Sequence, residues 1–184
     1  MNLLQKIYNL LNEVAIATLV KETPTKTKMR SITDVSNIKV LKDTPYKKGR
    51  YLQFEVTGST GKTYRPSIYL KNKYDRMGEA RARCNCPAWK WWGSGYNASN
   101  EDYRIRKTSG DEIEPNVRDP KRKNKLCKHV IACLDEIKKL EKTWKQKEFK
   151  FMKNLPKEKQ LEFIFNPPET AKGKEKQMEF GNEK

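Results

Sequence analysis

The chain has 184 residues, 34% of them charged, and its 40 lysines and arginines against 23 acidic residues give a formal net charge of +17. A chain of this length forms one domain, or one domain with an extension, around a modest core, and its basic excess attracts nucleic acid or acidic protein surfaces. No apolar run is long enough to cross a bilayer and the chain does not open with the basic segment of a signal peptide, so we expect no membrane contact and a cytoplasmic location, where thiols stay reduced.

Residues 2–19 predict a helix. Apolar side chains recur there at a spacing of about 3.5 residues, which gives a helix one apolar face; they are Leu3, Ile7, Leu10, Val14 and Ala17. We expect this helix to form an N-terminal segment of residues 1–22 that packs against the domain, with a partner-binding helix as the alternative.

From residue 29 onward the pattern changes to strands. Ile38 and Val40 alternate with polar residues, and residues 51–57 and 63–71 predict a hairpin around a turn at 58–62. Pro66 lies within the return strand and predicts a free edge or a bulge there. A further strand is predicted where Ala80, Ala82 and Cys84 alternate with Glu79, Arg81 and Arg83, and it runs into the pair Cys84 and Cys86.

The polar face of this sheet is predicted to be basic. Its cations are Lys39, Arg65, Lys71, Arg81 and Arg83, with Tyr51 and Tyr69 between them. Such a face either is simply solvated or contacts a phosphate backbone, exposed bases or an acidic partner.

Residues 87–126 are predicted to be a loop-rich insert. Trp89, Trp91 and Trp92 stand at its start, and they either cover a neighbouring site and pack the insert or form a contact surface. A basic run near its end offers a second contact for phosphates or acidic groups, or is an exposed turn; its members are Lys121, Arg122, Lys123 and Lys125.

A long helix is predicted to begin at Cys127. Its apolar stripe consists of Val130, Leu134, Ile137, Leu140 and Trp144, and Pro156 ends it. The expected fold class is therefore α+β, with a small antiparallel sheet packed on an N-terminal helix and a long C-terminal helix. Residues 23–155 would form the domain, and residues 156–184 an extended polar tail.

Two short Cys/His pairs predict a metal site. Cys84 and Cys86 lie one residue apart at a strand end, and Cys127 and His129 lie one residue apart at a helix start. Three thiolates and one imidazole are ligands that Zn²⁺ prefers, and four protein ligands make a closed, structural site for one ion. Cys133 is an alternative fourth ligand or a member of an iron–sulfur cluster, or else a small core residue.

This ligand pattern resembles SWIM-type zinc modules, in which Cys-x-Cys, a spacer and Cys-x-His open a helix. The resemblance covers about residues 50–140, and the spacer here is longer than those modules usually show. It implies one structural zinc ion. It also implies a role in DNA binding or in protein–protein contacts.

A narrower resemblance involves the insert. Cys-x-Cys-Pro, the run Trp92-Gly93-Ser94-Gly95-Tyr96, and Arg118-Asp119-Pro120 before Cys-Lys-His resemble small proteins encoded among the virion genes of tailed bacteriophages. This resemblance implies a virion protein that packs on the portal, neck or capsid near packaged DNA, with other virion proteins in a symmetric assembly as partners. A free module that binds DNA or RNA through its basic surface is the alternative.

Two further patterns argue against an enzyme. His129 is the only histidine, so a histidine-activated nucleophile would have to empty the predicted metal site. Residues 58–63 resemble the end of a phosphate-binding loop, but Val56 stands where that motif needs glycine, and a strand follows instead of a helix. We therefore expect no catalytic residues and no small-molecule substrate.

Overall fold

The computed structural model describes residues 15–46, 49–72, 75–105, 114–154 and 156. The chain divides into two compact units, residues 1–143 and 144–184. The second unit is described only at the end of the long helix α6 and at residue 156. The predicted N-terminal stripe from Leu3 to Val14 and the predicted tail from residue 157 onward lie outside the described residues.

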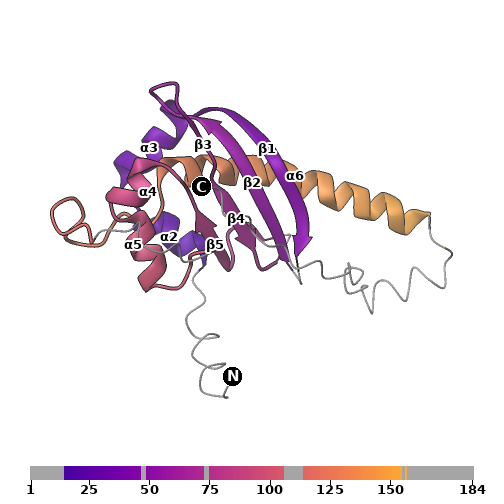
Figure 1. Cartoon of the computed structure of the whole chain (residues 1–184). Coiled ribbons are helices and arrows are strands. Elements are labelled where there is room, and N and C mark those ends of the chain that lie inside the picture. The colour runs from indigo at the N-terminus through magenta and orange to yellow at the C-terminus, as the bar shows by residue number, and fades with distance from the viewer. Residues whose placement is uncertain (1–14, 47–48, 73–74, 106–113, 155, 157–184) are drawn as a thin grey trace, which may run out of the picture. The chain divides into compact units, whose positions relative to one another are not determined.

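The elements confirm an α+β fold with a small antiparallel sheet and a long C-terminal helix (Figure 1). In chain order they are α2 (Ile16–Glu22), α3 (Thr25–Thr33), β1 (Ser36–Tyr46), β2 (Gly49–Thr57), β3 (Thr63–Tyr64), β4 (Ser67–Leu70), β5 (Ala80–Arg83), α4 (Pro87–Trp91), α5 (Ser94–Asn100) and α6 (Lys128–Lys153). The strand order is β1-β2-β4-β5, and β3 also pairs with β2. All four strand pairings are antiparallel.

One face of the sheet forms the core. Leu52 of β2 pairs with Ile68 of β4, which pairs with Ala82 of β5, and all three side chains are fully buried. Because side chains alternate along a strand, the intervening residues of β2 lie on the opposite, partly exposed face. The buried helix residues that complete the core include Ile16, Leu19, Val130, Cys133 and Ile137.

Helix α6 crosses the sheet and contacts two of the connections between strands, the turn after β2 and the turn between β4 and β5. The Nζ of Lys128 lies 3.1 Å from the Oγ of Ser59 in the turn after β2. Farther along the helix, Oε1 of Glu141 accepts a hydrogen bond of 2.8 Å from the backbone N–H of Arg76, in the turn between β4 and β5. Residues 128–141 rise about 20 Å along the helix axis, so two polar contacts far apart fix its direction.

The helix predicted over residues 2–19 needs correction in the part that the structure describes. Ile16 and Leu19 are the buried residues of α2, whereas Ala17 of the predicted stripe is exposed. Helix α3 follows directly after Pro24 and was not predicted. Its apolar residues Met29 and Ile32 are largely exposed, so it carries little of the pattern that marks a packing helix.

Pro66 interrupts the return strand and divides it into β3 and β4. Phe54 donates its N–H to the carbonyl of Pro66 over 2.9 Å, but proline has no N–H to return. The prediction of a free edge holds for β3, which among the described strands pairs only with β2, but not for β4, which lies between β2 and β5. The β2 pairings of β3 and β4 keep one register, so this strand has no bulge at Pro66.

The start of the insert is more ordered than predicted. Helices α4 and α5 occupy residues 87–100, where a loop was expected, and Trp89 and Tyr103 are buried. The backbone N–H of Ala82 donates to the carbonyl of Tyr103, and Ala82 accepts from the N–H of Ile105. The insert therefore covers the free side of β5 with backbone hydrogen bonds.

Replacing Glu141 by Ala should lower the free energy of unfolding by about 1–3 kcal/mol, because the N–H of Arg76 would lose its acceptor. Glu141→Gln keeps an oxygen acceptor and should cost less. Chemical denaturation of both variants measures the difference. A Glu141→Ala protein as stable as the unmodified one would contradict this role of the contact.

Candidate metal centre

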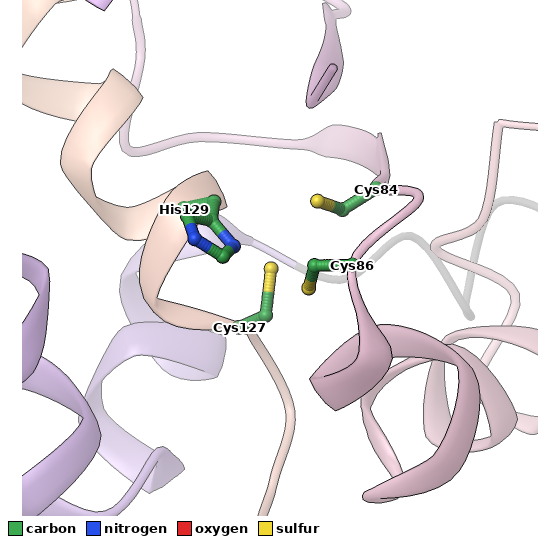
Figure 2. A group of neighbouring side chains, drawn as sticks. All are labelled: Cys84, Cys86, Cys127 and His129. Atoms are coloured by element: carbon green, nitrogen blue, oxygen red, sulfur yellow. The ribbon is translucent and has the colours of Figure 1, made fainter. Parts of the chain in front are cut away.

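Four predicted ligands come together in the structure. The ligand atoms of Cys84, Cys86, Cys127 and His129 all lie within 4.8 Å of one another. Figure 2 shows the three sulfur atoms gathered beside the imidazole ring. Each residue is at most 3% exposed. The arrangement can hold one metal ion.

The end of β5 and the start of α4 position the first pair. Cys84 follows directly after β5, and Cys86 is the N-cap of α4, where its Sγ accepts the N–H of Trp89 at 3.4 Å. Between them, Oδ1 of Asn85 accepts the N–H of Arg65 over 2.8 Å. Asn85 thus satisfies a backbone donor at the strand interruption and fixes the bend that aims both thiols to one side.

The start of α6 positions the second pair. The carbonyl of Cys127 accepts the N–H groups of Val130 and Ile131, so the helix begins directly after this residue. One residue earlier, the N–H of Leu126 donates to Oγ1 of Thr23 over 3.1 Å. The connection from α2 and the first turn of α6 therefore hold Cys127 from two sides.

Lys128, between the two ligands, ties the helix start to α3. Its Nζ lies 2.9 Å from Oδ2 of Asp34, which also accepts from Arg30. These hydrogen bonds, that of Arg30 first, hold the pKa of Asp34 well below its ordinary value. The carboxylate thus stays charged at neutral pH, and its contribution is lost only as pH falls into the acid range.

The residues fit a metal ion on chemical grounds. Both ring nitrogens of His129 are buried and have no hydrogen-bond partner among the described residues. A buried nitrogen without a partner costs about 1–3 kcal/mol, and a metal bond to one of the two removes that cost there. The cysteines are free thiols rather than disulfides, and three sulfurs with one imidazole suit tetrahedral coordination.

The three thiols influence one another strongly. Burial raises the pKa of Cys84 and of Cys127 well above the ordinary value. Hydrogen bonds from Cys127 and Cys84 lower the pKa of Cys86 well below it. Burial and mutual repulsion oppose negative charge on all three sulfurs at once, and a divalent cation would supply the charge that lets all three become thiolates.

Cys133 is not part of this group. It is fully buried, and burial raises its thiol pKa. The four clustered ligand atoms do not include its sulfur. Of the alternatives open at the sequence level, the structure supports the core residue.

Two neighbours of His129 were not identified from the sequence. The ring of Tyr64 lies 4.5 Å from the imidazole, centroid to centroid, at 35°. A Cβ atom on Gly58 would lie 3.1 Å from Nε2 of His129 and 2.8 Å from the ring of Tyr64. Glycine is common in turns, so the sequence does not single out Gly58. Only the packing shows that its lack of a side chain leaves room for the imidazole of His129.

The predicted sheet cations lie on the exposed side, but most have acidic partners. Arg65 lies 3.6 Å from Glu55, Lys71 lies 2.8 Å from Glu79, and Arg81 lies 3.1 Å from Asp102, each between side-chain nitrogen and oxygen. No ion pair involves Lys39 or Arg83 in the part of the chain that the structure describes.

The basic run of the insert likewise contains some residues that form ion pairs and others that are exposed. Lys125 is buried and forms ion pairs with Glu101 and Glu22, and Arg122 pairs with Glu114. Lys121 and Lys123 are exposed.

The three tryptophans also separate. Trp89 is buried, while Trp91 and Trp92 are 46% and 41% exposed. A contact surface at this end of the insert can therefore include Trp91 and Trp92, whereas Trp89 packs inside the protein.

Comparison with known proteins found no family model, no curated protein and no solved structure that matches this chain. Across the described residues, no helix is both long and apolar enough to cross a membrane. The assignment of a metal centre therefore rests on the geometry of the four side chains.

Substituting Gly58 by Ala should weaken metal binding about tenfold, because the added methyl group displaces the imidazole, as changes next to metal ligands commonly do. Gly61→Asn is a matched control in the same turn. A Cβ at Gly61 would meet nothing within 4 Å, and asparagine tolerates its φ of +74°. Competition with a chromophoric chelator measures both affinities; equal affinities for the two variants would contradict the prediction.

Proposed function

We propose that this chain is a non-enzymatic structural and interaction protein whose fold is stapled by one zinc ion, in a module of the SWIM type. The observation that carries the proposal is the buried group of three thiols and one imidazole at the junction of β5 and α6. A zinc ion there would join two segments that are far apart in the sequence, 84–86 and 127–129.

Zinc is favoured over other metals by the donor set. Thiolates select zinc, copper(I) or iron–sulfur clusters, and hard ions such as Mg²⁺ and Ca²⁺ require oxygen ligands. Three sulfurs and one nitrogen match the common Cys₃His structural zinc site. The order of a strand, Cys-x-Cys, Cys-x-His and a helix supports the SWIM type.

A structural rather than catalytic metal follows from the number of protein ligands. Catalytic zinc sites use three protein ligands and keep a position for water, whereas four protein ligands close the site. The only histidine of the chain belongs to this group, so it is not available as a general base.

The proposed setting is the virion of a tailed bacteriophage, on the portal, neck or capsid near packaged DNA. The support is the resemblance of the insert, and two of its motif segments are in contact. Gly93 has a φ of +100°, and a Cβ there would lie 2.6 Å from Oδ2 of Asp119. A side chain at position 93 would therefore collide with Asp119, so the packing of the two segments requires glycine there.

A free module that binds DNA or RNA is the second candidate. The formal net charge of +17 favours it, as do the exposed lysines and the exposed tryptophans of the insert. The two candidates are compatible, because a virion protein near packaged DNA also benefits from positive charge.

Purified protein should contain one zinc ion per chain, and a chelator should remove the metal together with the cooperative unfolding transition. Cys127→Ser should lose both, because it removes one of four ligands. Cys133→Ala should keep the zinc, since that thiol lies outside the group. Elemental analysis and thermal unfolding test this, and a zinc-free chain that folds cooperatively would refute the staple.

If the virion setting is correct, the protein should be recovered from purified particles at a fixed copy number. Quantitative mass spectrometry of particles from the producing cells measures this ratio. A chain found only in the cell lysate, with particles free of it, would exclude the virion role and leave the free module.

A further inference from the structure

The loop that follows the insert helices is held in place by one buried carboxylate. Asp119 is 5% exposed. Its Oδ1 accepts the N–H of Lys123 over 2.8 Å, and its Oδ2 accepts the N–H of Asn124 over 2.9 Å and Nδ2 of Asn97 over 3.1 Å. The carboxylate thus fixes the backbone of residues 119–124 on α5.

A second set of contacts ties the same loop to the end of α4. Nδ2 of Asn124 donates to the carbonyl of Trp92 over 2.7 Å. The guanidinium group of Arg118 lies over the ring of Trp92 at 5.5 Å, and that of Arg122 lies over the ring of Tyr96 at 4.5 Å. Aromatic rings and cations are therefore placed next to one another before any partner binds.

We define the aromatic–basic surface by its exposed members, which are Trp91, Trp92, Arg118, Lys121 and Lys123. No ion pair to an acidic side chain involves Arg118, Lys121 or Lys123 within the described ranges. Two described carboxylates of this loop are already engaged, since Asp119 is buried in backbone hydrogen bonds and Glu114 pairs with Arg122. The surface therefore attracts an anion.

We propose that the aromatic–basic surface binds single-stranded nucleic acid. Exposed indole rings offer faces on which bases stack, and flanking cations neutralise phosphates, which is the combination that single-strand binding uses. A duplex hides its base faces, and an acidic protein would need the cations but not the rings. This inference rests on the proposed interaction role and names the class of partner.

The ion pairs of the predicted sheet cations disfavour the sheet as the main binding face. Three of its five predicted cations are paired with carboxylates. Binding phosphate there would first break those pairs, whereas Lys121 and Lys123 form no ion pair with any described acidic residue.

The test uses the full-length protein and a fluorescently labelled oligothymidylate of about 15 nucleotides, a length that spans one typical single-strand site. Fluorescence anisotropy measures its dissociation constant. Trp92→Leu should weaken binding about tenfold through loss of stacking. The double variant Lys121→Ala with Lys123→Ala should weaken it by a similar factor and flatten the salt dependence.

The matched control is Lys138→Ala with Lys142→Ala, which removes the same charge from exposed positions of α6. It should change the affinity less than about twofold, because only the overall charge is lost. A duplex of equal length should bind more weakly than the single strand.

Three results would overturn the inference: no binding of oligothymidylate at low salt, an equal loss in the α6 control, or displacement by polyglutamate as effective as by unlabelled oligothymidylate. The last result would indicate an acidic protein partner. Zinc content is measured on each sample. One zinc per chain without binding refutes this inference alone, and binding by a zinc-free chain refutes only the staple.

Discussion

The arrangement of the first unit depends on the junction where the end of β5 meets the start of α6. Three thiols and an imidazole are enclosed there with both imidazole nitrogens unsatisfied among the described residues. An apolar core does not tolerate such a group without compensation, because buried polar atoms cost free energy when they lack partners. A metal ion bound there would replace that cost with four bonds and would join the sheet to the helix.

Contacts with neighbouring residues orient the four ligands at the junction. Asn85 holds the bend between Cys84 and Cys86 through the N–H of Arg65. Lys128 links the helix start to Asp34. Outer contacts of this kind determine whether ligands point at a common centre, which is why they matter as much as the ligands themselves.

In the insert, a buried carboxylate provides the partners that buried polar groups need. Asp119 collects two backbone N–H groups and one amide, and the loop around it becomes part of the fold. Because the loop backbone is already held, a partner that contacted its outward side chains would not have to order that backbone. The buried carboxylate thus helps to hold an insert with few apolar residues in place, and a metal ion at the junction would hold its two ends.

Local patterns in the sequence by themselves determined the alternation of β2, the apolar stripe from Val130 to Ile137 and the four ligands, because these depend on spacing along the chain. The tertiary structure alone decided contacts between distant residues. It placed Cys133 in the core, paired Arg81 with Asp102, put Gly58 against His129 and buried Trp89 while leaving Trp91 and Trp92 exposed. Helices α3, α4 and α5 were missed because each is short: α3 and α4 bury one residue each, and α5 consists largely of small polar residues, so none carries an apolar stripe that periodicity could reveal.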